Sequence, residues 1–237
     1  MNDIWIDTRL QPEEMDFLWN AISESTKESI NYNHALVGNI SKSELVKDND
    51  NWFYKSALKK LAERLFYDDW NNYRKYHIVK EEPQPKFEMN SFWVNYQKQH
   101  EFNPPHNHDG LYSFVVFMKI PTHWKDQHAL LFSVDSKSSR VSDFQFLLGH
   151  AQGQIRPIPI PLCPKDEGRM LFFPAWLMHQ VFPFFGTEEE RVTLSGNIVL
   201  QEELGTDTKE VMLEKMEKQV EYLKEVINRK KKFTERN

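Results

Sequence analysis

Hydrophobic residues in the middle of the chain recur with the two-residue period of β-strands. Residues 87–96 alternate between two faces, and residues 111–120 form a continuous β-branched and aromatic run that ends at Pro121. An alternating stretch is typical of a strand with one buried face, and a continuous run of a strand covered on both faces. Further strand-like runs, separated by turns, lie at 129–134, 144–148, 155–162 and 169–173. This spacing predicts a β-sandwich or barrel and not alternating βαβ units.

Apolar residues before and after these runs follow the helical period of three to four residues. One stripe starts at Pro12 and reaches Ile22, a second lies within residues 52–76, and a third, with charges between its apolar positions, lies within 202–237. Such stripes are typical of amphipathic helices that pack on a sheet. We expect one mainly β domain with flanking helices, divided into an N-terminal helical covering region, a barrel core and a long C-terminal amphipathic helix at 1–86, 87–201 and 202–237.

Composition limits the compartment and the kinds of partner. A chain of 237 residues is long enough for a sizeable core, and its net charge of -5 argues against a nucleic-acid partner. Cys163 is the single cysteine, so no intramolecular disulfide can form. The amino terminus lacks a signal-peptide pattern, and no apolar run is long enough to cross a bilayer. We therefore expect a cytoplasmic protein without a membrane partner, and the C-terminal stripe leaves a homodimer open.

Histidines flank the strand-like runs in a pattern that suggests a metal site. His106 and His108 are two residues apart, so an extended backbone projects both imidazoles to the same side. His179 stands in another apolar segment, and Arg191 and Thr193 follow in the next strand-like run. Imidazole is a common ligand of divalent iron and zinc. Three imidazoles from two distant segments would close a site if the barrel brings them together.

This combination resembles the 2-oxoglutarate and Fe(II)-dependent oxygenases over roughly residues 92–200. The segments 93–95 and 173–176 are similar to a branch of putative oxygenases that carries His-x-His where most of the family has His-x-Asp. The resemblance implies a jelly roll, also called a double-stranded β-helix. It also implies Fe(II), 2-oxoglutarate as co-substrate, dioxygen, and hydroxylation of a small-molecule or peptidyl substrate with release of succinate and CO2.

The same resemblance assigns roles to individual residues. The implied iron ligands are His106, His108 and His179. The far carboxylate of oxoglutarate would be paired by the guanidinium of Arg191, and the Thr193 hydroxyl lies two residues on along the same strand. Tyr96 is a candidate hydrogen-bond donor to oxoglutarate, and Asn95 is a weaker candidate.

Three ligand sets remain open at the histidine pair. If His106 and His108 both bind, the metal has three neutral ligands. Asp109 can replace one of them only if the strand bulges, which the neighbouring Gly110 permits. In the third set His108 is the first ligand and Gly110 takes the carboxylate place, as in halogenating relatives where a halide fills the gap. The first set is favoured because residues two apart in a strand point to the same face, whereas Asp109 would point to the opposite face from the two histidines.

Two other functions fit the same residues. A cupin-like zinc or manganese isomerase or hydrolase would use the three histidines without needing Arg191. A non-catalytic jelly-roll interaction module would need no metal and would assemble through the C-terminal helix. For an oxygenase, we expect the substrate-selecting loops at 122–127 and 135–143, and we expect residues 31–50 to form a polar loop.

Overall fold

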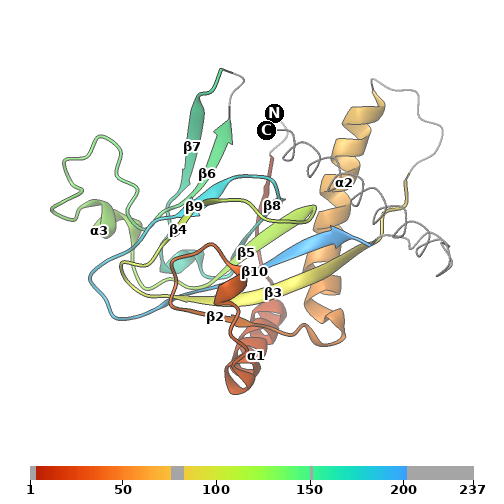
Figure 1. Ribbon diagram of the computed structural model, residues 1–237, viewed down its shortest axis with the longest axis horizontal. Coiled ribbons are helices and arrows are strands. Elements are labelled where there is room, and N and C mark those ends of the chain that lie inside the picture. The colour runs from red at the N-terminus through yellow and green to blue at the C-terminus, as the bar shows by residue number, and fades with distance from the viewer. Residues whose placement is uncertain (1–3, 76–82, 150–151, 202–237) are drawn as a thin grey trace, which may run out of the picture. The chain divides into compact units, whose positions relative to one another are not determined.

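Two antiparallel sheets form the framework of the protein (Figure 1). The computed structural model describes residues 4–75, 83–149 and 152–201. One sheet has six strands in the order β1-β8-β5-β10-β3-β2, and the other has four in the order β4-β9-β6-β7. The strands are β1 (Ile6–Arg9), β2 (Lys42–Leu45), β3 (Phe87–Gln97), β4 (Asn103–His106), β5 (Tyr112–Lys119), β6 (Phe144–Gly149), β7 (Ile155–Ile160), β8 (Arg169–Pro174), β9 (His179–Val181) and β10 (Arg191–Leu200). The expected mainly β architecture of antiparallel sheets is therefore confirmed.

Helices cover the side of the six-stranded sheet that faces away from the smaller sheet (Figure 1). The helix α1 (Pro12–Glu28) begins at the predicted proline, and α2 (Lys59–Arg74) follows a π-helical turn, η3 (Tyr54–Leu58). The remaining helical segments are α3 (Trp124–His128), η1 (Asn33–Ala35), η2 (Asn49–Asn51) and η4 (Pro164–Asp166). No helix among these described segments is long and apolar enough to span a bilayer.

Strand β5 separates two hydrophobic clusters, which explains its continuous apolar sequence. Phe114 and Val116 pack with the helices, in the cluster that also contains Leu18 of α1. Val115 and Phe117 point the other way, into the cluster between the two sheets. Because both faces of β5 are buried, consecutive residues along the strand can all be apolar.

Two predictions about individual segments are wrong. Residues 129–134 form turns and not a strand: Leu131 is 95% exposed and Phe132 is 66% exposed, because no neighbouring strand pairs with this run in the described part of the chain. Residues 31–50 are not only a loop, since β2 lies within them and pairs with β3. Ser43 and Glu44 of this strand are buried, and the Ser43 hydroxyl donates to Asn95 Oδ1 at 2.7 Å.

Several expectations lie outside what the structure tests. The predicted C-terminal helix at 202–237 falls outside the described residues, and so does the homodimer that it would mediate. The division into one domain with three regions and the cytoplasmic location also stay predictions.

Candidate functional site

A cavity of about 460 Å³ lies among the strands of both sheets. One wall is formed by the residues of β3, β5 and β10 whose side chains point away from the helices. The opposite wall comes from β4, β6 and β9. A third contribution comes from the segment between Tyr32 and Ser43, which precedes and enters β2. Cavities of this size are typical of small-molecule sites.

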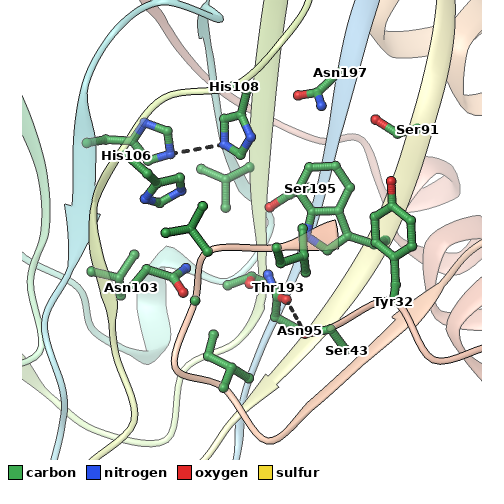
Figure 2. Close-up of a pocket in the computed structure, with 18 of the residues that line it drawn as sticks. Tyr32, Ser43, Ser91, Asn95, Asn103, His106, His108, Thr193, Ser195 and Asn197 are labelled. Carbon is green, nitrogen blue, oxygen red and sulfur yellow. Dashed lines mark hydrogen bonds between the residues drawn. The ribbon is translucent and has the colours of Figure 1, made fainter. Parts of the chain in front are cut away.

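Three histidines meet at one wall of the cavity. The antiparallel pairing of β4 with β9 sets His106 opposite His179, and their ring centroids are 4.2 Å apart. His106 and His108 lie together at this wall (Figure 2), and His108 Nε2 is 3.2 Å from His179 Nε2. One ring nitrogen from each of the three histidines lies within 4.8 Å of the others. Among the described residues, these three form a cluster that could hold a metal ion. The structure thus brings together the three predicted ligands.

Backbone carbonyls orient two of these imidazoles. His106 Nδ1 donates to the Pro104 carbonyl at 2.7 Å, and His179 Nδ1 donates to the Leu177 carbonyl at 2.9 Å. A proton on Nδ1 leaves the Nε2 lone pair free, which is the tautomer that a metal ligand needs. The ring of His108 packs against the indole of Trp93 at 5.7 Å between centroids.

Burial keeps the three imidazoles neutral. Desolvation lowers the pKa of His106, and it lowers the pKa of His108 to about 4 with a further contribution from the His106 charge. The pKa of His179 is lowered well below its usual value, first by desolvation and then by the charges of the other two histidines. Neutral imidazoles are the form that binds metal.

The spacing of the nitrogens fits a divalent metal. Two nitrogen ligands about 2.1 Å from an ion, at adjacent corners of an octahedron, lie about 3 Å apart. The two Nε2 atoms of His108 and His179 are at 3.2 Å. The Asp109 side chain is exposed and lies outside the cluster, and Gly110 adopts a left-handed backbone with φ of 105°. Of the three ligand sets, the structure assembles the one with three neutral histidines.

Arg191 is a buried cation without a carboxylate partner in the described chain. It has no exposed surface, and its Nη2 donates to the carbonyl and the hydroxyl of Ser142 at 2.9 and 2.5 Å. Its Nη1 makes a long 3.5 Å bond to Gln97 Oε1, and its Nε has no partner. Burial lowers the pKa of Arg191 to about 10, although the nearby charge of Asp143 acts in the opposite direction. The guanidinium lines the cavity and still has N–H groups to donate.

The other candidates for oxoglutarate binding lie on opposite faces of the six-stranded sheet. Thr193 and Asn95 face each other across β10 and β3, and both line the cavity. Tyr96 is on the opposite face of β3, in the helix-side cluster. Its hydroxyl lies 3.1 Å from Thr26 Oγ1, and Lys42 Nζ lies over its ring. The structure does not bring Tyr96 to the cavity, because neighbouring residues of a strand point to opposite sides.

Sequence reasoning missed several residues of the cavity wall. Ser195 and Asn197 continue the alternation that starts at Arg191 and Thr193, so the two-residue period was a signal for them. Ser142 does not line the cavity but holds Arg191, and it had no comparable signal, because this contact involves a turn in which Ser142 has a φ of 72°. No residue of 122–127 or 135–143 lines the cavity, and their role as substrate-selecting loops stays a prediction.

Comparison with known proteins agrees with this geometry. Residues 91–197 match the family model described as putative 2OG-Fe(II) oxygenase. No curated protein sequence matches the chain.

Solved structures resemble the fold. A prolyl-4-hydroxylase from Pseudomonas putida has 12% identity and a TM-score of 0.50, with 84% of this chain and 94% of that chain covered. The non-heme alpha-ketoglutarate-dependent carbocyclase SnoK from nogalamycin biosynthesis has 8% identity and a TM-score of 0.52, with 84% and 79% covered. At such low identity these similarities concern the jelly-roll fold alone.

The family match covers all three histidines and Arg191. The resemblance drawn from the sequence is therefore confirmed. Residues 91–197 belong to the superfamily of 2-oxoglutarate and Fe(II)-dependent oxygenases, whose members use Fe(II), 2-oxoglutarate and dioxygen.

Proposed function

We propose that this protein is an Fe(II)- and 2-oxoglutarate-dependent dioxygenase that hydroxylates a C–H bond of a small-molecule or peptidyl substrate. In this reaction one oxygen atom of dioxygen enters the substrate as a hydroxyl, and the other enters succinate as oxoglutarate loses CO2. The observation that carries the proposal is the presence, on the walls of one cavity, of three neutral imidazoles and a buried guanidinium that makes no ion pair with a carboxylate of the described residues.

The histidines supply the metal-binding part of this function. His106, His108 and His179 would hold Fe(II) through one ring nitrogen each, and the Nδ1 bonds of His106 and His179 to backbone carbonyls fix their rings. When bound, the iron activates dioxygen together with oxoglutarate. Three neutral ligands leave the charge of the metal uncompensated, so a dianionic co-substrate would balance it.

Arg191 supplies the anion-binding part. Its partner Ser142 is two residues before Phe144, whose ring stacks on His179 at 5.5 Å between centroids. Arg191 and the histidine cluster are therefore linked by one short segment. A dicarboxylate that binds the metal through one end would place its second carboxylate toward this guanidinium, where a buried charge needs a partner. Thr193 and Asn95 would add neutral hydrogen bonds along the same face.

Absorption spectroscopy without oxygen tests the proposal. Adding Fe(II) and oxoglutarate under argon should give a visible metal-to-ligand charge-transfer band, and admitting air should yield succinate. A His179→Ala variant should give neither. If the wild-type protein binds iron by metal analysis but shows no band, the oxygenase proposal is wrong.

A zinc or manganese hydrolase or isomerase is the second candidate, because three neutral histidines are also a catalytic zinc ligand set. That chemistry does not require the buried cation. Turnover that survives in an Arg191→Gln variant, with zinc as the active metal, would favour this candidate.

A further inference from the structure

Strand β10 crosses the cavity from end to end, with Arg191 at one end of the lining face and Asn197 at the other. Six residues of extended backbone separate them, which corresponds to about 20 Å. Oxoglutarate, a five-carbon dicarboxylate anchored at the Arg191 end, is too short to reach Asn197. The Asn197 end of the cavity is therefore left for a different molecule.

The histidine cluster lies between these two ends. On the Arg191 side, the segment from Ser142 to Phe144 connects the guanidinium to His179. On the other side, the chain that leaves His108 returns to β10, where the Leu111 amide donates to the Ile198 carbonyl at 2.9 Å. Figure 2 shows Asn197 and Ser91 on the sheet wall that faces the histidines. A molecule at the Asn197 end would thus have access to the metal from the side opposite to Arg191.

Asn197 has a hydrogen-bond donor available for such a molecule. It pairs in register with Ser113 on one side and with Ser91 on the other. The Ser113 hydroxyl donates to Asn197 Oδ1 at 2.6 Å, which fixes the amide. Ser91 donates to Asn90 instead, and the Asn197 Nδ2 makes no hydrogen bond with any described residue. The free amide N–H groups match an oxygen acceptor on a ligand.

The lining of this end carries almost no charge. Apart from the histidines, the charged residues among those that line the cavity are Arg191 and Asp109. Asp109 is exposed, where water screens its charge. The other polar lining residues at the Asn197 end are amides and hydroxyls. Enclosing a charged ligand among neutral groups is costly, whereas a neutral ligand that satisfies them is not.

We propose that the end of the cavity lined by Asn197 and Ser91 binds the substrate, and that the substrate is uncharged and presents a carbonyl or hydroxyl oxygen to the Asn197 amide. This rests on the proposed oxygenase function and specifies the chemical class of its substrate. Asn197 is then a specificity-determining residue, and it orients the C–H bond toward the metal.

Matched fragments test the charge preference. The probes are benzamide, benzoate and benzylamine, which carry a neutral, an anionic and a cationic group on the same ring. Binding is followed by saturation-transfer NMR on the full-length protein with Zn(II) and oxoglutarate, so that no turnover occurs. The wild-type protein should bind benzamide at least about tenfold more tightly than the other two, the difference expected for one well-made hydrogen bond plus the cost of a buried charge.

Asn197→Asp reverses the expected preference, because the carboxylate can still accept from Ser113 but repels an oxygen acceptor. Benzamide binding should fall about tenfold and benzylamine binding should rise. The matched control is Asn20→Asp, at an exposed position on α1, which should behave like wild type. If Asn197→Asp does not fold, Ser113→Ala replaces it and should weaken benzamide binding by releasing the amide.

Each other outcome contradicts the inference. It is wrong if benzamide does not bind, if the variants leave the order of the three fragments unchanged, or if benzylamine binds best and loses affinity in Asp109→Asn. Oxoglutarate affinity, measured in the same samples, separates this failure from that of the proposed function. Oxoglutarate binding with no amide preference refutes only the substrate class, whereas Asn197-dependent amide binding without oxoglutarate binding refutes the oxygenase proposal.

Discussion

Arg191 offers the sharpest test of the site because its hydrogen bonding is incomplete. A guanidinium has five N–H donors, and three hydrogen bonds to Ser142 and Gln97 are present, one of them long. Two donors are thus available for a carboxylate. A charge-assisted hydrogen bond contributes about 1.5–3 kcal/mol. Arg191→Gln, which removes both, should therefore weaken oxoglutarate binding by at least about 3 kcal/mol, or on the order of 10²-fold or more in Kd.

Calorimetric titration of the zinc-loaded protein with oxoglutarate measures this effect. Arg191→Lys keeps the charge but loses the planar fork, so its affinity should lie between those of wild type and Arg191→Gln. Arg64→Gln, on the exposed face of α2, is the matched control and should bind like wild type. If Arg191→Gln binds metal, melts cooperatively and has an oxoglutarate Kd within threefold of wild type, the assignment of Arg191 is refuted.

Three further predictions follow from the surroundings of the cavity. Fe(II) added under argon at about 100 times its Kd should stabilise the fold by about 2.7 kcal/mol and raise Tm by about 5–10 °C; an unchanged melting curve would contradict metal binding at the histidine cluster. Tyr96→Phe should leave the oxoglutarate Kd unchanged, because the hydroxyl contacts Thr26, and should lower the free energy of unfolding in urea by about 1 kcal/mol. A loss of oxoglutarate affinity would instead assign Tyr96 to the cavity. Burial raises the pKa of Asp143 from 3.8 to about 6, so the folded state binds its proton more tightly and the free energy of unfolding should fall by up to about 3 kcal/mol as pH rises from about 4 to about 6. Asp143→Asn should lack this part of the pH dependence, and identical pH profiles for the two proteins would exclude it.

Strand parity carried most of what the sequence predicted correctly about the site. His106 and His108 share a direction in an extended chain, and the same rule aligned Thr193 with Arg191. The Tyr96 expectation came from resemblance and conflicted with parity, which groups Tyr96 with Phe92 and Val94. Local backbone geometry was the better guide, because the direction of a side chain in a regular strand does not depend on distant contacts.

Features set by distant contacts could not be predicted in this way. The apolar run at 129–134 has the composition of a strand but no pairing partner in the described chain, so it forms turns. The segment from Tyr32 to Ser43 is polar, and its burial follows from contacts such as Ser43 with Asn95 that lie far apart in sequence. Hydrophobic periodicity carries no information about which polar segment will find partners across the fold.

The pairing of β1 with β8 and of β2 with β3 has a consequence for experiments on shortened forms of the protein. The stretch from 91 to 197 that matches the family model lacks both outer strands of the six-stranded sheet, the first four of the 11 residues of β3, and the whole of α1 and α2. Excised alone, it would present the apolar side of its sheet to water and expose unpaired strand edges, which favours aggregation. We therefore expect the stretch from 91 to 197 not to fold on its own, and the walls of the cavity depend on residues that lie before it.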